Sequence, residues 1–325
     1  MLRLPNARRP GLSLTEVLVT LFVVAIGLIS LMTLFPVGAM QMGQALRDDR
    51  IRQTANQADG MTRIWWQMEV VERPGMEDAF FTAMDNPGGS LPPRAPTDSG
   101  PSYPVFLDPI GWQARSPATQ NWMTGATNSL PRRSARPLGN SLQLTARACS
   151  LMDDITFNPN GTPDTTSGTA SPGSLVREGA YNWCAVIQRP VNSNRYTADL
   201  KICVFHTKGL YGGHIPGLNQ TGSEAILSGL QLNAATAGTT QIDVQLPASA
   251  LALRSGSWIL DGSNATVANF YRIQSITEIV AGSRTILELD TPLKSNASQI
   301  YVIKGLAEVF DRPQLTASGY RRQLP

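Results

Sequence analysis

The chain has 325 residues, with 42% hydrophobic and 16% charged residues and a formal net charge of +3. This length allows about two domains, and the apolar fraction excludes a fully disordered chain. Three of the basic residues, Arg3, Arg8 and Arg9, lie near the N-terminus, and the other 24 equal the 24 acidic residues in number. The body of the chain therefore has no net charge that would favour nucleic acid as a partner.

A long apolar run follows the basic N-terminal segment. No charged residue occurs from Val17 to Leu46, and Val17–Phe35 consists almost wholly of apolar or small side chains. At 1.5 Å per residue, a helix of this length approaches the hydrocarbon thickness of a bilayer. The run predicts one transmembrane helix. By the positive-inside rule, the N-terminus is expected in the cytoplasm, with the rest of the chain exported from the inner membrane to the periplasm or the cell exterior.

Glu16 is an unusual residue because it lies directly before this apolar run. Carboxylates at the edge of a span are often functional or paired, although the simplest interpretation is an acid that favours the N-terminal end of the helix dipole. Two alternatives for the whole segment remain open. One is a signal peptide cleaved at the small residues Val37-Gly38-Ala39, and the other is a plain uncleaved anchor.

The residues GLSLTE at positions 11–16, preceded by two arginines, resemble the processing site of type IV prepilins and type II secretion pseudopilins. The following apolar sequence is most similar to PilV-like minor pilins. This resemblance implies that a prepilin peptidase cleaves after Gly11 and methylates the new amine of Leu12, and that Glu16 serves filament assembly. It covers residues 1–65, and for the rest of the chain it implies only a helix followed by a sheet.

The expected fold class is α+β, with a long N-terminal helix and an antiparallel β-rich head that has long loops and a second small β module. The 28 glycines and 23 prolines favour long irregular connections. The expected organisation is a leader at 1–11, a transmembrane and amphipathic stalk helix at 12–69, a loop-rich head at 70–221 with a hairpin at 180–206, a second β module at 222–313 and a loose tail at 314–325.

The stalk after Pro36 has its own periodicity. Apolar residues recur at spacings near three and four, at Leu46, Ile51, Ala55, Ala58, Trp65 and Met68. This pattern favours a helix that packs on its own sheet. A docking face for a partner helix is the alternative.

Two strands stand out in the head, at Ala180–Gln188 and Ala198–His206, joined by a turn-rich segment. Antiparallel pairing with residue numbers that sum to 387 places Trp183 opposite Val204, Ala185 opposite Ile202 and Ile187 opposite Leu200 on one core face. The same register places Cys184 opposite Cys203 on the other face, which we expect to point outward. The two cysteines are a candidate disulfide, with Cys149 left as a thiol.

The second module is predicted from six short runs of β-forming residues bounded by turn residues. These runs are 241–246, 257–260, 270–279, 285–289, 300–303 and 306–310.

Chemistry-bearing motifs are not found in the sequence. It contains no G-x-S-x-G, H-E-x-x-H, P-loop or dinucleotide fingerprint. The only histidines are His206 and His214, and Cys203 and His206 are three apart on a predicted strand, so they face opposite sides and do not favour zinc. A polar stretch that includes Asp164 lacks the carboxylates of a calcium loop. We therefore expect neither an enzyme nor a cofactor.

The sequence thus favours a structural subunit of a type IV pilus or a type II secretion-like filament. Its expected partners are the prepilin peptidase, other pilin or pseudopilin subunits and the membrane, and nucleic acid is not expected. The alternative is a membrane-anchored envelope enzyme or binding module that shares only the anchor.

Overall fold

The structure is a computed structural model in which the chain divides into two compact units, Met1–Arg50 and Ile51–Pro325. We call them the N-terminal and the C-terminal unit and describe each by itself. The residues that the structure describes are 13–72, 78–86, 91–95, 100–107, 132–133, 149–151, 155, 157, 159–163, 181–191, 194–206, 224–228, 232–245, 253–280, 284–303 and 305–317.

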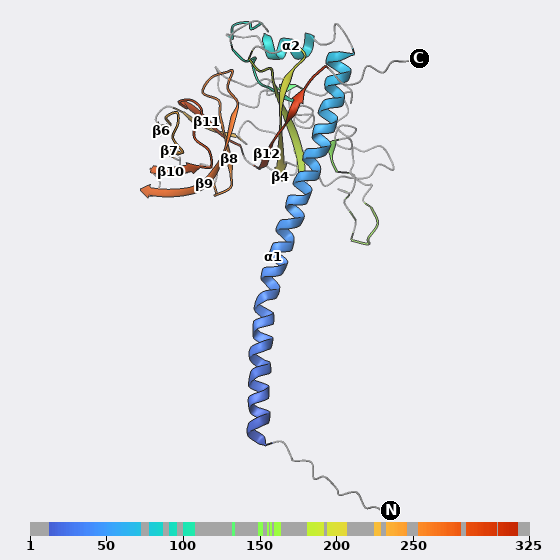
Figure 1. The fold of residues 1–325 in the computed structure, drawn as a ribbon, viewed down its shortest axis with the longest axis vertical. Coiled ribbons are helices and arrows are strands. Elements are labelled where there is room, and N and C mark those ends of the chain that lie inside the picture. Colours follow the sequence, from blue (N-terminus) through green and yellow to red (C-terminus); the bar gives the residue numbers. More distant parts are fainter. Residues whose placement is uncertain are drawn as a thin grey trace, which may run out of the picture. The chain divides into compact units, whose positions relative to one another are not determined.

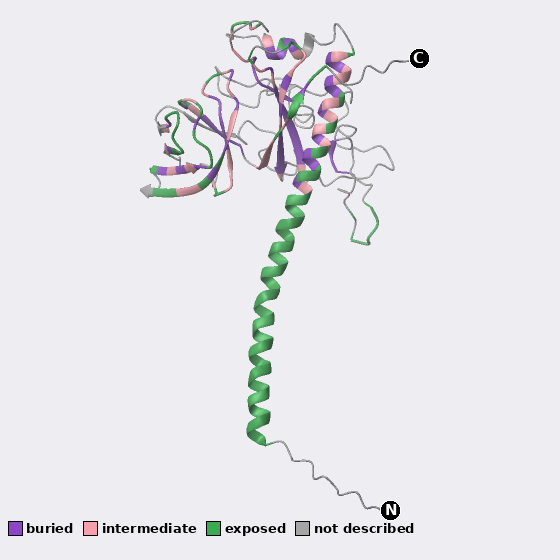
Figure 2. Ribbon diagram, viewed as in Figure 1, coloured by how far each residue is buried: buried purple, intermediate pink, exposed green. Residues whose placement is uncertain are grey.

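Helix α1 (Leu14–Trp66) begins two residues after the predicted start of the helix at residue 12 and continues through Pro36. A π-helical segment, η1 (Gln67–Val71), follows it directly. Side chains of α1 up to residue 49 are exposed, whereas a helical stripe is buried from Ile51 onward (Figure 2). The buried residues of α1 are Ile51, Thr54, Ala55, Ala58, Thr62, Trp65 and Trp66. Four of them belong to the predicted apolar stripe, so the interpretation of a helix that packs on its own sheet is confirmed for this part.

The first sheet has five strands in the order β12-β4-β3-β1-β2; Figure 1 labels β12 and β4, which lie side by side. Their bounds are Leu306–Leu315 for β12, Ala198–His206 for β4, Tyr181–Gln188 for β3, Val105–Leu107 for β1 and Arg132–Arg133 for β2. The pairing of β3 with β4 has the predicted register, since Trp183 pairs with Val204 and Cys184 with Cys203. All neighbours are antiparallel except β1 and β2.

One face of this sheet packs against the C-terminal part of α1 and the short helix α2 (Asp78–Asp85). Trp183 lies at the centre of this core, fully buried. Its ring stacks on Trp65 with centroids 5.6 Å apart, and its indole Nε1 donates to the carbonyl of Cys149 at 3.1 Å. The predicted core face of the hairpin is therefore confirmed.

The second sheet has seven strands in the order β5-β11-β8-β9-β10-β7-β6. Their bounds are Glu224–Ser228 for β5, Gln299–Ile303 for β11, Trp258–Asp261 for β8, Asn269–Val280 for β9, Arg284–Leu289 for β10, Gln241–Val244 for β7 and Leu232–Ala234 for β6. Five of these strands match predicted runs. The remaining two were not predicted, because β5 (EAILS) has its apolar residues side by side rather than in alternation and β6 has only three residues.

The last predicted strand of the second module belongs to the first sheet instead, because Leu306–Leu315 pairs with β4. The chain returns at Gly305, which has a left-handed φ of +79° and whose carbonyl accepts the amide of His206 at 2.8 Å. A Cβ at this glycine would lie 2.8 Å from the carbonyl oxygen of His206, so the close approach favours glycine. The predicted boundary at 313 is therefore wrong for this strand.

The predicted loose tail is also wrong at its start, because β12 extends to Leu315, a buried residue. Arg63 of α1 holds this end of the strand, since its guanidinium donates to the carbonyls of Pro313 at 2.6 Å and Gln314 at 3.3 Å.

A third correction concerns the face of the hairpin that carries the cysteines, which we expected to point outward. In the structure this face packs against the second sheet, in a cluster formed by Phe106, Cys184, Val186, Cys203, Phe205, Leu260, Ala268, Tyr301, Ile303 and Leu306. Each face of the hairpin packs in a core cluster, which explains why both faces carry apolar residues. Alternation within the strands could not distinguish a covered second face from a solvent-exposed one.

An ion pair joins α2 to the end of β3. The guanidinium of Arg189 contacts the Asp85 carboxylate at 2.5 Å, and the side chains are only 3% and 17% exposed. The backbone at Arg189 is also fixed, because its amide donates to Ser102 Oγ at 2.9 Å and its carbonyl accepts the Ser102 amide at 3.1 Å. Asp85 is the last residue of α2, so the arginine also lies near the negative end of that helix dipole.

Candidate functional site

The predicted processing residues Gly11 and Leu12 lie outside the described residues. Glu16 lies in the first turn of α1 and is exposed. Its backbone amide is 3.0 Å from the Ser13 carbonyl and 3.2 Å from Ser13 Oγ, so Ser13 caps the helix. Ser13 was not among the predicted site residues, although Ser13-x-x-Glu16 has the spacing of a capping box. The cap therefore involves the backbone amide of Glu16, and its side chain is exposed.

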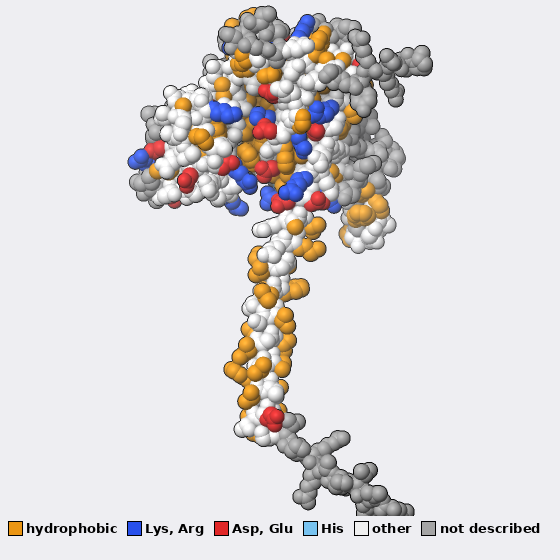
Figure 3. Space-filling model, viewed as in Figure 1, with side chains coloured by type: hydrophobic (Ala, Val, Ile, Leu, Met, Phe, Trp, Pro, Cys, Tyr) orange, Lys and Arg blue, Asp and Glu red, His pale blue; other side chains and the backbone are white. Residues whose placement is uncertain are grey.

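Every residue of the apolar part of α1 is exposed in the N-terminal unit, and Figure 3 shows apolar side chains along the face in view. Its most apolar window has a mean hydropathy of 2.7, and none of that window is buried, so the helix is long and apolar enough to cross a membrane. Phe22 is 66% exposed and Phe35 is 79% exposed. A helix that is apolar all round requires an apolar environment rather than water.

Two threonine hydroxyl groups inside this segment donate to backbone carbonyls of the helix itself. Thr20 Oγ1 donates to the carbonyls of Glu16 at 3.0 Å and Val17 at 2.8 Å, and Thr33 Oγ1 donates to the carbonyl of Ser30 at 2.8 Å. Polar groups in hydrocarbon need such internal partners because lipid offers none. The two threonines therefore fit an apolar environment in spite of their polarity.

The cysteine pair of the hairpin lies where the two sheets meet. Cys184 and Cys203 are directly opposite each other across β3 and β4, fully buried, and both are thiols in the structure. Opposite residues of an antiparallel pair have Cα atoms about 4.5–5.5 Å apart, within the range that a disulfide spans. The backbone therefore permits a bridge, and the bridge itself remains a prediction.

We expect Cys184 and Cys203 to be oxidised in the protein isolated from an exported compartment, and the bridge to stabilise the C-terminal unit by roughly 3 kcal/mol. The measurement is alkylation under denaturing conditions without reductant, followed by peptide mass analysis. Only Cys149 should be labelled. In Cys184→Ala, Cys203 should become labelled as well, and labelling of all three cysteines in the unmodified protein would contradict the bridge.

The other residues considered for metal or acid–base chemistry do not converge. Cys203 lies in the cluster between the sheets, whereas His206 contacts the ring of Tyr181 at 5.0 Å between centroids. His214 and Asp164 lie outside the described residues. Among the residues described, no three His, Cys, Asp or Glu side chains are placed to hold a metal ion. Burial raises the pKa of Tyr301 to about 12, so its phenol keeps its proton in neutral solution.

The chain has no match among family models or curated proteins, and it has only weak similarity to a solved phage structure. Among solved structures, a match to the phage phi92 endosialidase has 11% sequence identity and a TM-score of 0.18. That match covers 42% of this chain and 19% of the phage protein. A similarity this low carries no argument about fold or function.

Proposed function

We propose that the protein is a minor pilin-like or pseudopilin-like structural subunit that is processed after Gly11 and assembles through its N-terminal helix. In this role the chain does not turn over a substrate. The helix first lies in the inner membrane, with the N-terminus cytoplasmic and the C-terminal unit exported, and then enters the core of a type IV pilus or type II secretion-like filament. Its partners are the prepilin peptidase and other subunits of the filament.

The observation that carries the proposal is the exposure of the apolar helix. Nineteen large apolar side chains between Leu14 and Leu46 are exposed to at least 43%. Full burial of one such side chain is worth about 1.5–3 kcal/mol, so covering the whole set is worth tens of kcal/mol. A bilayer or a bundle of like helices provides such an environment.

The features at the start of the helix favour assembly over a simple anchor. The capped Glu16 lies at the polar edge of the apolar segment, where a carboxylate is available to a charged group of a neighbouring subunit. In a plain anchor this acid would gain only its interaction with the helix dipole. In combination with the resemblance of residues 11–16 to prepilin processing sites, this position supports a helix that is cleaved and then packed against others.

Replacing Gly11 by valine is expected to block processing, because a β-branched side chain would crowd a peptidase pocket shaped for glycine. The protein is expressed in matched hosts with and without a prepilin peptidase, and its N-terminus is determined by intact mass and peptide sequencing. The unmodified protein should begin at N-methylated Leu12 only where the peptidase is present. Gly11→Val should retain the leader in both hosts.

A suitable control is Gly27→Val, because a Cβ at Gly27 meets no atom within 4 Å and the position lies outside both candidate cleavage sites. This variant should be cleaved normally. For the unmodified protein, a mature N-terminus at Met40 would instead indicate a signal peptide. Retention of Met1 in the presence of the peptidase would favour the membrane-anchored module.

A further inference from the structure

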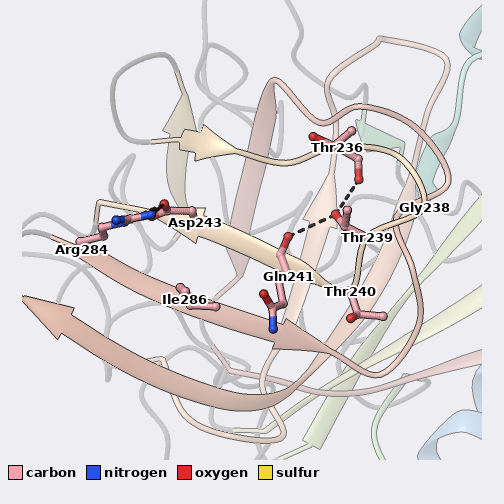
Figure 4. A pocket seen from close by; sticks show the side chains of 8 residues that line it. All are labelled: Thr236, Gly238, Thr239, Thr240, Gln241, Asp243, Arg284 and Ile286. Carbon is pink, nitrogen blue, oxygen red and sulfur yellow. Dashed lines mark hydrogen bonds and ion pairs between the residues drawn. The ribbon is translucent and has the colours of Figure 1, made fainter.

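A polar pocket of about 540 Å³ lies on the outer face of the seven-stranded sheet, where β7 and β10 meet the turn after β6 (Figure 4). The pleat of the strands places its side chains there. On β7 Ile242 is buried in the core, whereas Gln241 and Asp243 line the pocket. On β10 the lining residues are Arg284 and Ile286, and Asp243 pairs directly with Ile286 across the two strands.

The turn that forms the pocket's other side is held in place by its own hydrogen bonds. Gly238 has a left-handed φ of +82°, and its amide donates to the Leu293 carbonyl at 2.8 Å. The Leu293 amide returns a bond to the Thr239 carbonyl at 2.9 Å, and Thr239 Oγ1 donates to the Thr236 carbonyl at 2.7 Å. The threonine side chains of this turn are therefore presented from a fixed backbone.

The charges in the pocket cancel. Arg284 Nε donates to Asp243 Oδ2 at 2.7 Å, and this hydrogen bond raises the pKa of the guanidinium above its ordinary value. The Asp243 side chain is 13% exposed and that of Arg284 is 52% exposed. An anionic ligand would meet the carboxylate and a cationic ligand would meet the guanidinium, so the site favours neither.

We propose that this pocket binds a neutral carbohydrate. Neighbouring hydroxyls of a sugar donate to one group and accept from the next, which suits Asp243 as acceptor, Arg284 as donor and the Gln241 amide as both. Ile286 is half-buried and offers an apolar contact to the C–H face of a pyranose ring. The volume lies within the range of small-ligand sites, and six of the eight lining residues carry polar side chains beside the apolar surface of Ile286, which suits a ligand with both hydroxyl groups and C–H faces.

The test uses the full chain in lipid nanodiscs prepared without sugar-based detergents. Methyl glucoside, methyl mannoside, methyl galactoside, maltose, cellobiose and lactose are titrated separately, and the methyl resonances of Ile286 and the pocket threonines are followed by NMR. At least one probe should bind saturably with a Kd on the order of 1 mM, because each hydrogen bond replaces one to water and contributes little net energy. Inorganic sulfate and methylamine serve as charged probes.

Gln241→Ala and Arg284→Met should each raise the Kd roughly five- to tenfold, the loss expected for one or two hydrogen bonds. Gln274 on β9 and Arg254 in the turn before β8 are exposed and lie outside the pocket. Gln274→Ala and Arg254→Met remove the same groups there and should leave the Kd unchanged. The proposal is overturned if no sugar binds saturably, if binding survives both pocket variants, or if sulfate or methylamine binds more tightly than every sugar. None of these outcomes depends on processing or filament assembly, so the test is independent of the function proposed above.

Discussion

Replacing Asp85 by alanine is expected to destabilise the C-terminal unit by about 3–5 kcal/mol, because it leaves the buried guanidinium of Arg189 without its counter-charge. The Arg189 side chain is 3% exposed, and its backbone is held by two hydrogen bonds with Ser102, so the guanidinium starts from a fixed and buried position. The loss of an acid at the end of α2 would by itself be favourable to the helix dipole. That gain is smaller than the cost of the uncompensated charge, so the net change in the free energy of unfolding is a loss of stability.

Urea unfolding of the full chain, followed by tryptophan fluorescence, measures this effect because Trp183 and Trp65 report on the same core. Asp311→Ala is the matched control, since it removes a carboxylate that is paired with Lys201 but 80% exposed. The control should cost less than about 1 kcal/mol. The double variant Asp85→Ala/Arg189→Met should be more stable than Asp85→Ala alone. Equal destabilisation by Asp85→Ala and Asp311→Ala would contradict the interpretation.

The elements that sequence analysis predicted well are those whose pattern is local. The hairpin of β3 and β4 has two strands of eight and nine residues, and only one register brings the large apolar residues of both strands onto one face. Helix α1 follows from an apolar run and a spacing of three and four, which packing only reinforces.

The elements that sequence analysis predicted wrongly depend on contacts distant in the chain. The pattern of β12 fits either sheet, and the close turn at Gly305 is what returns it to β4. Asp85 and Arg189 are far apart in the sequence, and no local pattern around either residue predicts their ion pair. The two side chains meet because α2 packs on the first sheet. For the candidate assembly site, the motif identified Glu16. The spacing Ser13-x-x-Glu16 also predicts a helix cap, but both residues belong to the GLSLTE motif, so the spacing was attributed to the motif alone.

Replacing Glu16 by alanine is expected to abolish assembly without affecting the fold of the C-terminal unit. After cleavage, a positive amine at Leu12 would lie beside an apolar helix, and packing in a filament core would remove water from both the amine and the carboxylate of a neighbour. Pairing the two offsets both desolvation costs and fixes the axial register of the subunits. Without the carboxylate the amine is uncompensated, which in buried sites costs about 3–5 kcal/mol, equivalent to a roughly hundredfold or greater loss of incorporation.

Three variants separate this role from helix capping. Glu16→Gln keeps a side chain that can complete a capping box but removes the charge, whereas Ser13→Ala removes the observed cap and keeps the charge. Incorporation is measured in sheared filaments and by crosslinks to other subunits, and thermal unfolding of the purified chain reports on the fold. If charge pairing drives assembly, Glu16→Ala and Glu16→Gln should both be lost from filaments, and Ser13→Ala should be incorporated. Normal incorporation of Glu16→Ala would show that the residue acts only at the helix end, and would favour a membrane-anchored module over a filament subunit.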